Sequence, residues 1–306
     1  MSDELTQFKD CFREAAPAFF QEFLRTEAAE PNTLARLGGS MLGWAKVALG
    51  DEYADLLIEG YCSFVMEVNR AQRTYEASGH YEYSTFSEVY VKAYSNKDFM
   101  NLYHWGVYCS TFIWLHHLKI YQFFERYFLP ILANQQEVGQ LVDLGSGSGI
   151  WHLLALEQLP SWQVTAVDIS EPSIEMSARM ASDLPCSQNI RHVCADATRW
   201  KSSEPMDAGI SCFLLEHLER PQELLSSLSA ALKPGAHAFI TGAITAAEID
   251  HIYEFKSEGE ILSLVESVGF RVKHLYSAEP VNTPRNRKYL PRSLAMVVQK
   301  RHNEVW

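Results

Sequence analysis

The sequence predicts an α/β fold, with a parallel sheet in the C-terminal part and helices alone in the N-terminal part. From Gln140 onward, short apolar runs alternate with helical stretches, as they do where helices connect parallel strands. A glycine-rich turn over residues 145–149 follows the first of these runs. Before residue 135, apolar residues instead recur at spacings of three and four, which is the periodicity of helices. We therefore expect an all-helical region over 1–135 and an α/β domain over 136–306.

The helical region is expected to contain four main apolar-periodic stretches. They cover 12–24, 34–49, 53–68 and 107–129. Breaks are expected at Pro31 and at 50–51, 78–79 and 95–96, where glycine, proline and small polar residues interrupt the pattern. Pro130 and the polar run 134–137 then end the helical region. Eleven of the fourteen tyrosines lie between Tyr53 and Tyr127, in the helical region.

The α/β domain is expected to have seven strands. The apolar runs that we assign to them are 140–144, 163–168, 190–194, 207–212, 236–241, 270–276 and 294–300. The last two are joined by a proline-rich loop over 277–291 and are expected to pair. The turn Lys233-Pro234-Gly235 is expected to lie just before the fifth strand.

Composition narrows the classes of partner. The 306 residues carry a net charge of −12, and an acidic surface repels phosphate backbones, so a nucleic-acid substrate is not expected. The apolar stretch 99–118 contains polar residues and histidines and is expected to be a buried helix rather than a membrane span. The six cysteines form no CxxC pair and no metal-ligand spacing, and the N-terminus has no signal-peptide pattern. We expect a cytoplasmic protein with no structural metal.

The strongest motif is the glycine turn, which joins a buried strand ending at Leu144 to a helix expected to begin near Ile150. Glycines let the backbone turn sharply and approach a ligand closely, and free N–H groups at a helix start favour a polar or anionic group. The dinucleotide fingerprint requires its third glycine at the position of Ile150. The pattern here is GxGxG, which resembles motif I of class I S-adenosylmethionine (SAM)-dependent methyltransferases.

Features further along the chain strengthen the resemblance. Asp168 ends the second expected strand, Asp196 follows the third, and the fourth is followed by Leu214-Leu215-Glu216-His217-Leu218, which resembles the "LLEHL" segment of the family. The alternative is that the aspartates are ordinary turn residues at strand ends. The resemblance covers 140–300 and implies a Rossmann-like, seven-stranded class I methyltransferase fold with a helical N-terminal cap.

The resemblance also implies a SAM site. Its expected cofactor-binding residues are Asp143, Gly145, Ser146, Gly147, Gly149, Asp168, Ile169, Asp196, Ala197, Phe213 and Tyr103. In the family, the first strand-end carboxylate accepts the ribose hydroxyls and the second faces the adenine amine. The (D/N)PP(Y/F) tetrapeptide of methyltransferases that act on nucleic-acid amines is absent, because the fourth strand runs into Ser211-Cys212-Phe213.

The aromatic residues upstream of the glycine turn raise the question of specificity. Tyr103, Tyr108, Trp114 and His117 crowd one helix, and in related enzymes the corresponding helix covers the cofactor and lines the substrate site. Aromatic faces suit a sulfonium, which is a cation without hydrogen-bond donors. The alternative is that these side chains pack the helical cap onto the α/β domain.

The segment after the fifth strand is a second candidate. Asp250, His251 and Glu254 follow the carboxyl end of that strand, where ligands bind in open α/β sheets. The "DHIYxF" pattern at this point is similar to one found in many bacterial methyltransferases. The alternative is the start of a helix, with Asp250 as its cap and His251 as a packing residue.

The leading functional hypothesis is transfer of a methyl group to an oxygen or nitrogen of a small molecule. His251, His117, Glu216 and Tyr108 are the candidate catalytic residues. The first alternative is a methyltransferase-like enzyme that attacks the Cγ of the methionine moiety, as the azetidine carboxylate synthases do on SAM itself, with release of methylthioadenosine. The second is a regulator that only binds SAM. A homodimer is compatible with each of these.

Overall fold

The computed structural model describes residues 2–91, 97–281 and 288–302. The chain divides into two compact units, and it passes between them more than once. Unit 1 consists of Met1–Gln122, Ala246–Ile252 and Ala278–Pro291, and unit 2 of Phe123–Thr245, Tyr253–Ser277 and Arg292–Trp306. Two short segments that follow strands of the sheet thus belong to unit 1. No helix among the described residues is long and apolar enough to cross a membrane.

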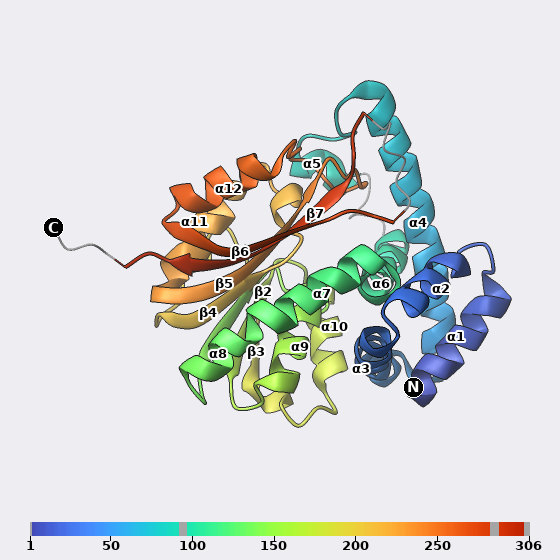
Figure 1. Ribbon diagram of the computed structural model, residues 1–306, viewed down its shortest axis with the longest axis horizontal. Helices are drawn as coiled ribbons and strands as arrows, with labels where there is room; N and C mark the ends of the chain where they lie inside the picture. Colours follow the sequence, from blue (N-terminus) through green and yellow to red (C-terminus); the bar gives the residue numbers. More distant parts are fainter. Residues whose placement is uncertain (1, 92–96, 282–287, 303–306) are drawn as a thin grey trace. The chain divides into compact units, whose positions relative to one another are not determined.

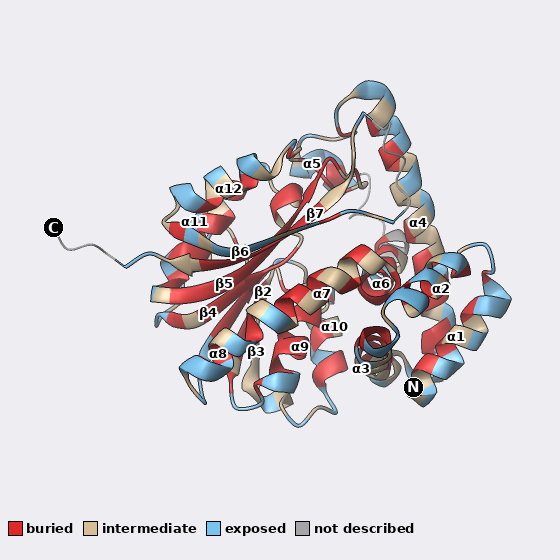
Figure 2. Cartoon of the chain, in the orientation of Figure 1, coloured by how far each residue is buried: buried red, intermediate tan, exposed pale blue. Residues whose placement is uncertain are grey.

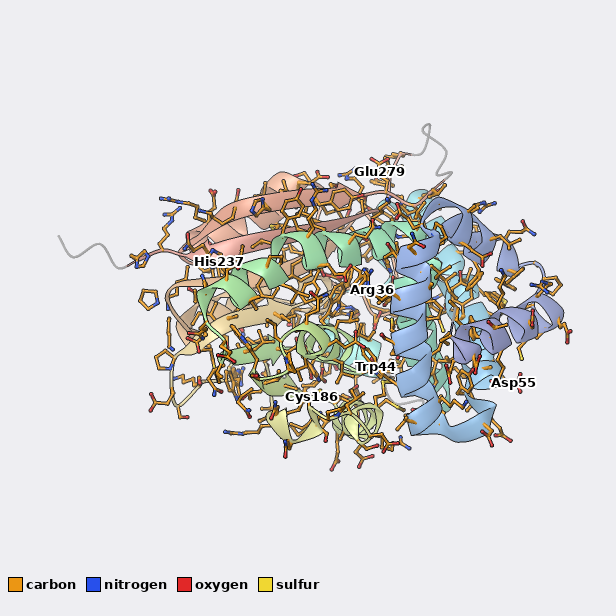
Figure 3. All side chains as sticks on the ribbon, turned by 60° about the horizontal axis from the view of Figure 1, so that its bottom comes forward. Arg36, Trp44, Asp55, Cys186, His237 and Glu279 are labelled. Carbon is orange, nitrogen blue, oxygen red and sulfur yellow. The ribbon has the colours of Figure 1, made fainter. Side chains whose placement is uncertain are left out.

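Unit 1 is built from helices. They are α1 (Asp3–Ala15), α2 (Phe20–Ala29), α3 (Pro31–Leu49), the 3-10 turn η1 (Gly50–Glu52), α4 (Tyr53–Ser78), α5 (Phe86–Val89), α6 (Lys97–Ile113) and the first part of α7 (Leu115–Tyr127) (Figure 1). Buried phenylalanines hold the first helices together. Phe12 of α1 packs with its ring centroid 5.4 Å from that of Phe20 and 5.5 Å from that of Tyr61 on α4. Trp44 of α3, labelled in Figure 3, is also buried.

Unit 2 contains one seven-stranded sheet. Its strands are β1 (Gln140–Leu144), β2 (Gln163–Asp168), β3 (Ile190–Cys194), β4 (Met206–Ser211), β5 (Leu232–Ile244), β6 (Phe270–Ala278) and β7 (Arg292–Lys300). They lie in the order β3-β2-β1-β4-β5-β7-β6. β1 to β5 are parallel, and β7 is antiparallel to β5. The carboxyl ends of β1, β2, β4 and β5 therefore meet at one edge.

The helices of unit 2 cover the sheet. They are α8 (Leu129–Gln135), α9 (Ile150–Gln158), α10 (Glu171–Ala181), α11 (Pro221–Ala231) and α12 (Glu258–Ser267), with the 3-10 turns η3 (Ser187–Asn189) and η4 (Leu215–His217). Phe239 of β5 packs against Phe124, Phe128 and Trp151, which belong to α7, the α7–α8 junction and α9. Figure 2 shows the middle strands buried along most of their length, so the sheet forms the core of this unit.

Most of the predicted elements are present. The first three strands have the predicted bounds, β4 begins one residue earlier, and β5, β6 and β7 are longer than predicted. The predicted pairing of the last two strands is confirmed by the strand order. The turn predicted at Lys233-Pro234-Gly235 is instead part of β5, where Gly235 has a φ of +81°.

Two helix predictions were wrong in part. The stretch 12–24 is divided between α1 and α2, because Pro17 removes a backbone donor after Ala16. The stretch 107–129 is divided among α6, α7 and α8, and Pro130 begins α8 rather than ending the helical region. The break predicted at 95–96 lies outside the described residues. The break at Gly79 is confirmed by its left-handed conformation after α4.

The division into units differs from the boundary expected at residue 135. Residues 123–135 belong to unit 2, because the aromatic side chains at the end of α7 pack against Phe239 of the sheet.

Candidate functional site

The glycine loop lies at the carboxyl end of β1, as the sequence predicts. Gly145, Gly147 and Gly149 all have positive φ, at +76°, +51° and +91°. The N–H groups of Gly145 and Ser146 donate to the carbonyl of Val167 at 2.8 and 3.1 Å, which ties the loop to β2. A Cβ on Gly147 would meet no atom within 4 Å, so the backbone at this residue is open to an approaching group.

Asp168 faces this loop from the end of β2. Its Oδ2 accepts the N–H of Gly147 at 2.8 Å, and its Oδ1 accepts the N–H of Ser170 at 2.9 Å. Ile169, the next residue, exposes 62% of its surface although it is large and apolar. A carboxylate beside an exposed aliphatic side chain is suited to a ligand that has both hydroxyl groups and an apolar ring.

Asp196 forms a turn at the end of β3. Its Oδ1 accepts the N–H of Thr198 at 2.9 Å and the Thr198 hydroxyl at 2.6 Å, while Oδ2 lies 3.8 Å from Arg199 Nε. Asp196 is therefore a turn residue at a strand end, which was the alternative considered for the aspartates in the sequence. Ala197, which follows it, is buried.

The segment after β4 packs against the glycine loop. Ser211 Oγ donates to the carbonyl of Leu144 at 2.9 Å. A Cβ on Gly145 would collide with Leu214, so glycine permits this close packing. Phe213 has a φ of +50°, and its N–H donates to Thr241 Oγ1 of β5 at 2.8 Å. A non-glycine residue in this conformation marks a strained point of the kind that is common in binding sites.

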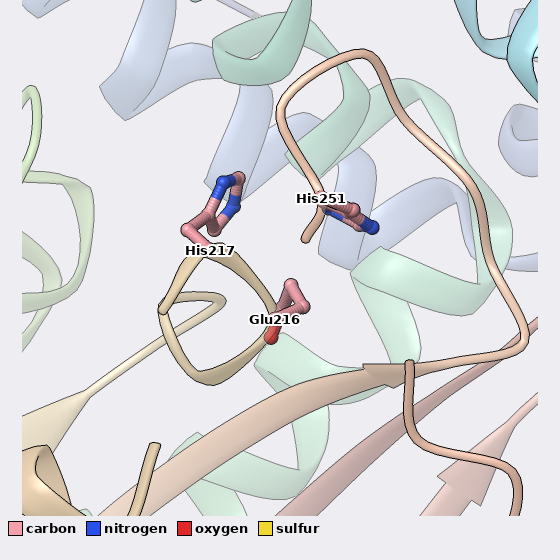
Figure 4. Close-up of side chains that lie close together, drawn as sticks. All are labelled: Glu216, His217 and His251. Carbon is pink, nitrogen blue, oxygen red and sulfur yellow. The ribbon is translucent and has the colours of Figure 1, made fainter. Parts of the chain in front are cut away.

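Glu216 lies on the turn η4, directly beyond that strained residue (Figure 4). Its side chain is fully buried, and among the described residues neither carboxylate oxygen has a hydrogen-bond partner. The loop residue Ser146 also has a buried Oγ without a partner in the described part of the chain. Buried polar atoms are nearly always hydrogen-bonded, so two such side chains at one sheet edge indicate places where a ligand would supply the missing partners.

A buried polar network lies beneath the loop and was missed by the sequence analysis. Asp143 Oδ2 is 2.9 Å from His152 Nδ1, and His152 Nε2 is 3.3 Å from Ser177 Oγ. Ser177 Oγ is also 3.0 Å from His192 Nε2. Burial lowers the pKa of His192, which favours its neutral form. The sequence signal was His152 alone, a single polar residue in the apolar run 150–156.

Cys212 directly follows β4 and is buried. Burial raises the pKa of its thiol well above the usual value, and the negative charges of Asp143 and then Glu216 add to that effect. The side chain is therefore a neutral thiol that packs in the core.

Tyr103, predicted to contact the cofactor, lies in unit 1 among carboxylates. Its hydroxyl is 2.7 Å from Glu248 Oε2 and 2.9 Å from Asp250 Oδ1. Burial raises the pKa of Tyr103 well above its usual value, and the two carboxylates raise it further. The helix start considered for Asp250 was wrong, because residues 246–252 form a loop.

His251 is on the same loop, and it is also drawn in Figure 4. Its Nδ1 lies 2.8 Å from the carbonyl of Ala246, and its Nε2 lies 3.7 Å from Glu248 Oε2. The tyrosine hydroxyl of Tyr81 donates to the same Ala246 carbonyl at 2.9 Å. Glu254, which the sequence analysis grouped with this loop, belongs to unit 2.

The other two candidate catalytic residues lie in unit 1 with structural partners. The hydroxyl of Tyr108 is buried and donates to the carbonyl of Met41 at 2.6 Å. His117 Nδ1 is 3.2 Å from Ser110 Oγ, and its ring centroid is 5.0 Å from that of Trp114. Removal from water lowers the pKa of His117 to about 3. A histidine with this pKa is a weak proton acceptor at neutral pH.

One group within unit 1 has the composition of a metal site. Ligand atoms of Glu248, Asp250 and His251 lie within 4.8 Å of one another. No metal cluster of histidine, cysteine and carboxylate side chains was predicted from the sequence, although these three residues lie within one short segment.

The structure thus brings together the predicted residues of unit 2 at one sheet edge: the glycine loop, Asp168, Ile169, Asp196, Ala197, Phe213 and Glu216. They fit SAM, because they offer open backbone at Gly147, an unpartnered hydroxyl at Ser146 and a strand-end carboxylate beside an exposed aliphatic side chain. Tyr103, Tyr108, His117 and His251 lie in unit 1, and their functional roles remain predictions.

Comparison with protein families identifies this part of the chain. Residues 141–235, from β1 into β5, match the family model described as a methyltransferase domain. A ubiquinone biosynthesis O-methyltransferase of Caulobacter vibrioides is 29% identical over 100 residues, which are 33% of this chain and 39% of that protein. A tRNA1(Val) (adenine(37)-N6)-methyltransferase of Glaesserella parasuis is 26% identical over 83 residues, which are 27% of this chain and 35% of that protein. The chain therefore spans less than two-fifths of the length of these curated relatives.

Solved structures with related folds include an N1-methyltransferase of Burkholderia thailandensis bound to 1,6-didemethyltoxoflavin and S-adenosylhomocysteine. It is 23% identical, with a TM-score of 0.45, over 58% of this chain and 78% of that one. A putative methyltransferase of Bacillus halodurans is 15% identical, with a TM-score of 0.46, over 57% of this chain and 99% of that one.

Proposed function

We propose that the chain transfers the methyl group of SAM to a small molecule, because residues 141–235 match the family model described as a methyltransferase domain. The observation that carries the proposal is the glycine loop at the end of β1, with the Asp168 carboxylate accepting the N–H of Gly147 and an unpartnered Ser146 hydroxyl beside it. SAM supplies an electrophilic methyl group when it is bound.

Different residues of unit 2 would bind different parts of the cofactor. Asp168 would accept hydroxyl groups of the ribose, and Ile169 would cover an apolar ring with its exposed side chain. Asp196 has already committed Oδ1 to Thr198, so its Oδ2 would be the atom that meets the adenine amine. Open backbone and the free hydroxyl of Ser146 would hold the methionine end.

Glu216 would act on the acceptor. It is the one predicted catalytic residue that lies in the same unit as the glycine loop, and its carboxylate oxygens have no partner among the described residues. A buried carboxylate can hold an acceptor in one orientation and take up its proton. The neutral His117, with a pKa near 3, is less suited to that role.

The small-molecule acceptor is supported by the acidic composition of the chain. A net charge of −12 disfavours a polyanionic substrate. The matched regions are only 39% and 35% of the two curated relatives, so we do not transfer the acceptors of those proteins to this chain.

The test is the identity of the adenosyl by-product. The full chain is incubated with SAM alone and then with SAM plus a small-molecule extract from which proteins and nucleic acids have been removed. We expect S-adenosylhomocysteine only when the extract is present, and Asp168→Ala should give much less of it at the same limiting concentration of SAM.

Two results would contradict the proposal. Methylthioadenosine formed from SAM alone would favour the cyclising alternative, because that reaction needs no second substrate. S-adenosylhomocysteine formed with purified tRNA or protein, but not with the extract, would exclude a small-molecule acceptor.

A further inference from the structure

Glu216 is unusual among the buried polar side chains of unit 2. Asp143 has His152, Ser211 has the Leu144 carbonyl, and Thr241 accepts the N–H of Phe213. The hydroxyl of Ser146 also lacks a partner in the described chain, but it lies on the glycine loop that we assign to the cofactor. Glu216 is 0% exposed, and both of its carboxylate oxygens lack a hydrogen bond within the described chain. A charged group in this state destabilises the folded protein, so its presence calls for a reason other than stability.

Toward β5, the surroundings of Glu216 in unit 2 are apolar. The backbone of Gly242 on β5 passes so closely that a Cβ there would lie 3.4 Å from Leu215 and 3.7 Å from Glu216 Oε2. Cys212 stays a neutral thiol because burial raises its pKa. A ring nitrogen of His217 lies within 4.8 Å of the carboxylate, but no hydrogen bond joins the two.

The position of Glu216 relates it to the acceptor rather than to the cofactor loop. It follows Phe213 and Leu214, which contact β5 and the glycine loop, and its own backbone carbonyl accepts the N–H of Tyr253 at 2.9 Å. The carboxylate is thereby fixed at the carboxyl ends of β4 and β5. Substrates of open α/β sheets bind beyond these ends.

An ammonium group would be a better hydrogen-bond partner for the Glu216 carboxylate than a neutral donor. A hydroxyl would donate one hydrogen bond and leave the negative charge of a fully buried carboxylate uncompensated. An ammonium donates a stronger, charge-assisted hydrogen bond and also neutralises the charge. We propose that Glu216 binds the ammonium group of an amine acceptor, so that the substrate of this site is a small amine rather than a phenol or alcohol.

This inference rests on the proposed function and narrows it. Glu216 holds the amine as its ammonium form and accepts one proton from it, which leaves a neutral amine beside a protonated carboxyl group. The proton that Glu216 gains is returned to solvent after product leaves. No further reactant is needed for this step.

The first arm of the test measures stability without ligand. Glu216→Gln and Glu216→Met remove the uncompensated charge and keep the size of the side chain, so thermal unfolding of the full chain should shift upward by about 2 °C or more. Glu175→Gln, on the exposed surface of α10, is the matched control and should not change the transition. A fall in the unfolding temperature of both Glu216 variants would show a structural role and overturn the inference.

The second arm measures binding by ligand-observed NMR in the presence of S-adenosylhomocysteine. The probes are butylamine and phenethylamine, each with its matched alcohol. We expect the amines to bind the unmodified chain more tightly than the alcohols, and Glu216→Gln to weaken amine binding about tenfold, as for one charge-assisted hydrogen bond. Equal binding of amines and alcohols, or no binding of either, would overturn the inference.

Two controls separate this inference from the proposed function. SAM affinity, measured by calorimetry, should be the same for Glu216→Gln and the unmodified chain; its loss in the variant would assign Glu216 to the cofactor and refute the amine role alone. Failure of the unmodified chain to bind SAM would refute the proposed function, while the stability arm would still report on Glu216. Zinc ion alone is the last probe. If zinc binds in a way that depends on Glu216 and the amines do not bind, Glu216 is a metal ligand and the amine inference is overturned.

Discussion

The two units use their polar and aromatic side chains differently. In unit 2 the polar groups named as candidates gather at one edge of the sheet, and two of them, Ser146 Oγ and both oxygens of Glu216, are buried without partners in the described chain. In unit 1 the candidate side chains are engaged with each other or with backbone: Tyr108 with Met41, His117 with Ser110, and Tyr103 with Glu248 and Asp250. The type of a residue alone is therefore weak evidence that its side chain is functional. Its hydrogen-bond partners must also be known.

The largest expected effect concerns the glycine loop. A Cβ on Gly149, at a φ of +91°, would collide with Ser177 Oγ and lie 2.9 Å from His152 Nε2, whereas a Cβ on Gly147 would meet nothing within 4 Å. Gly149→Ala should destabilise the ligand-free chain by about 3 kcal/mol, from backbone strain and overpacking together. Gly147→Ala should cost only the backbone part, about 1 kcal/mol. Denaturant unfolding measures the two free energies of unfolding. An equal decrease in both variants would mean that Ser177 and His152 move aside for the added methyl group without an energetic penalty.

The intermediate effect concerns Tyr108. Tyr108→Phe removes the buried hydrogen bond to the Met41 carbonyl and should lower the unfolding free energy by about 0.5–1.5 kcal/mol. If this hydroxyl serves only to bind the Met41 carbonyl, the affinity for SAM and the rate of product formation should stay unchanged. A large loss of rate with unchanged stability would instead support the catalytic role predicted for Tyr108.

The smallest expected effect concerns the surface of unit 1. Hydrogen bonding from Lys119 lowers the pKa of Glu30 below its usual value of 4.5, with Gln122 and Thr33 contributing. Because the folded-state pKa is the lower one, the stabilisation is present above about pH 4.5 and is lost as the pH falls through the folded-state pKa. Glu30→Gln should therefore cost about 0.5 kcal/mol at pH 7 and progressively less below pH 4.5. A decrease in unfolding free energy that does not depend on pH would show that the charge of Glu30 contributes nothing to its contact with Lys119.

The strands of unit 2 were predicted well because local sequence patterns mark them. The first three strands have their predicted bounds, and the carboxyl ends of parallel strands must meet, so Gly145, Asp168 and Asp196 reach one edge once the strands are assigned. The buried contact of His152 with Asp143 could not be seen, because it depends on the side-chain geometry of α9 against β1.

The sequence was less informative about unit 1. A helical periodicity identifies a buried face but not the neighbour that occupies it, and thus Tyr103 could be assigned to the cofactor as readily as to Glu248 and Asp250. The division of 107–129 into separate helices also depends on tertiary packing, since no glycine or proline marks Trp114 where α6 ends and α7 begins.

The most direct test of the account is calorimetric titration of SAM into the full chain and into Asp168→Ala. Asp183→Ala, which removes an exposed carboxylate elsewhere in unit 2, is the control. We expect the unmodified chain and the control to bind SAM with the same affinity, and Asp168→Ala to bind at least about tenfold more weakly, because the ribose hydroxyls lose a charged acceptor. Unchanged SAM affinity in Asp168→Ala, or no binding by the unmodified chain, would contradict the assignment of this sheet edge as the cofactor site.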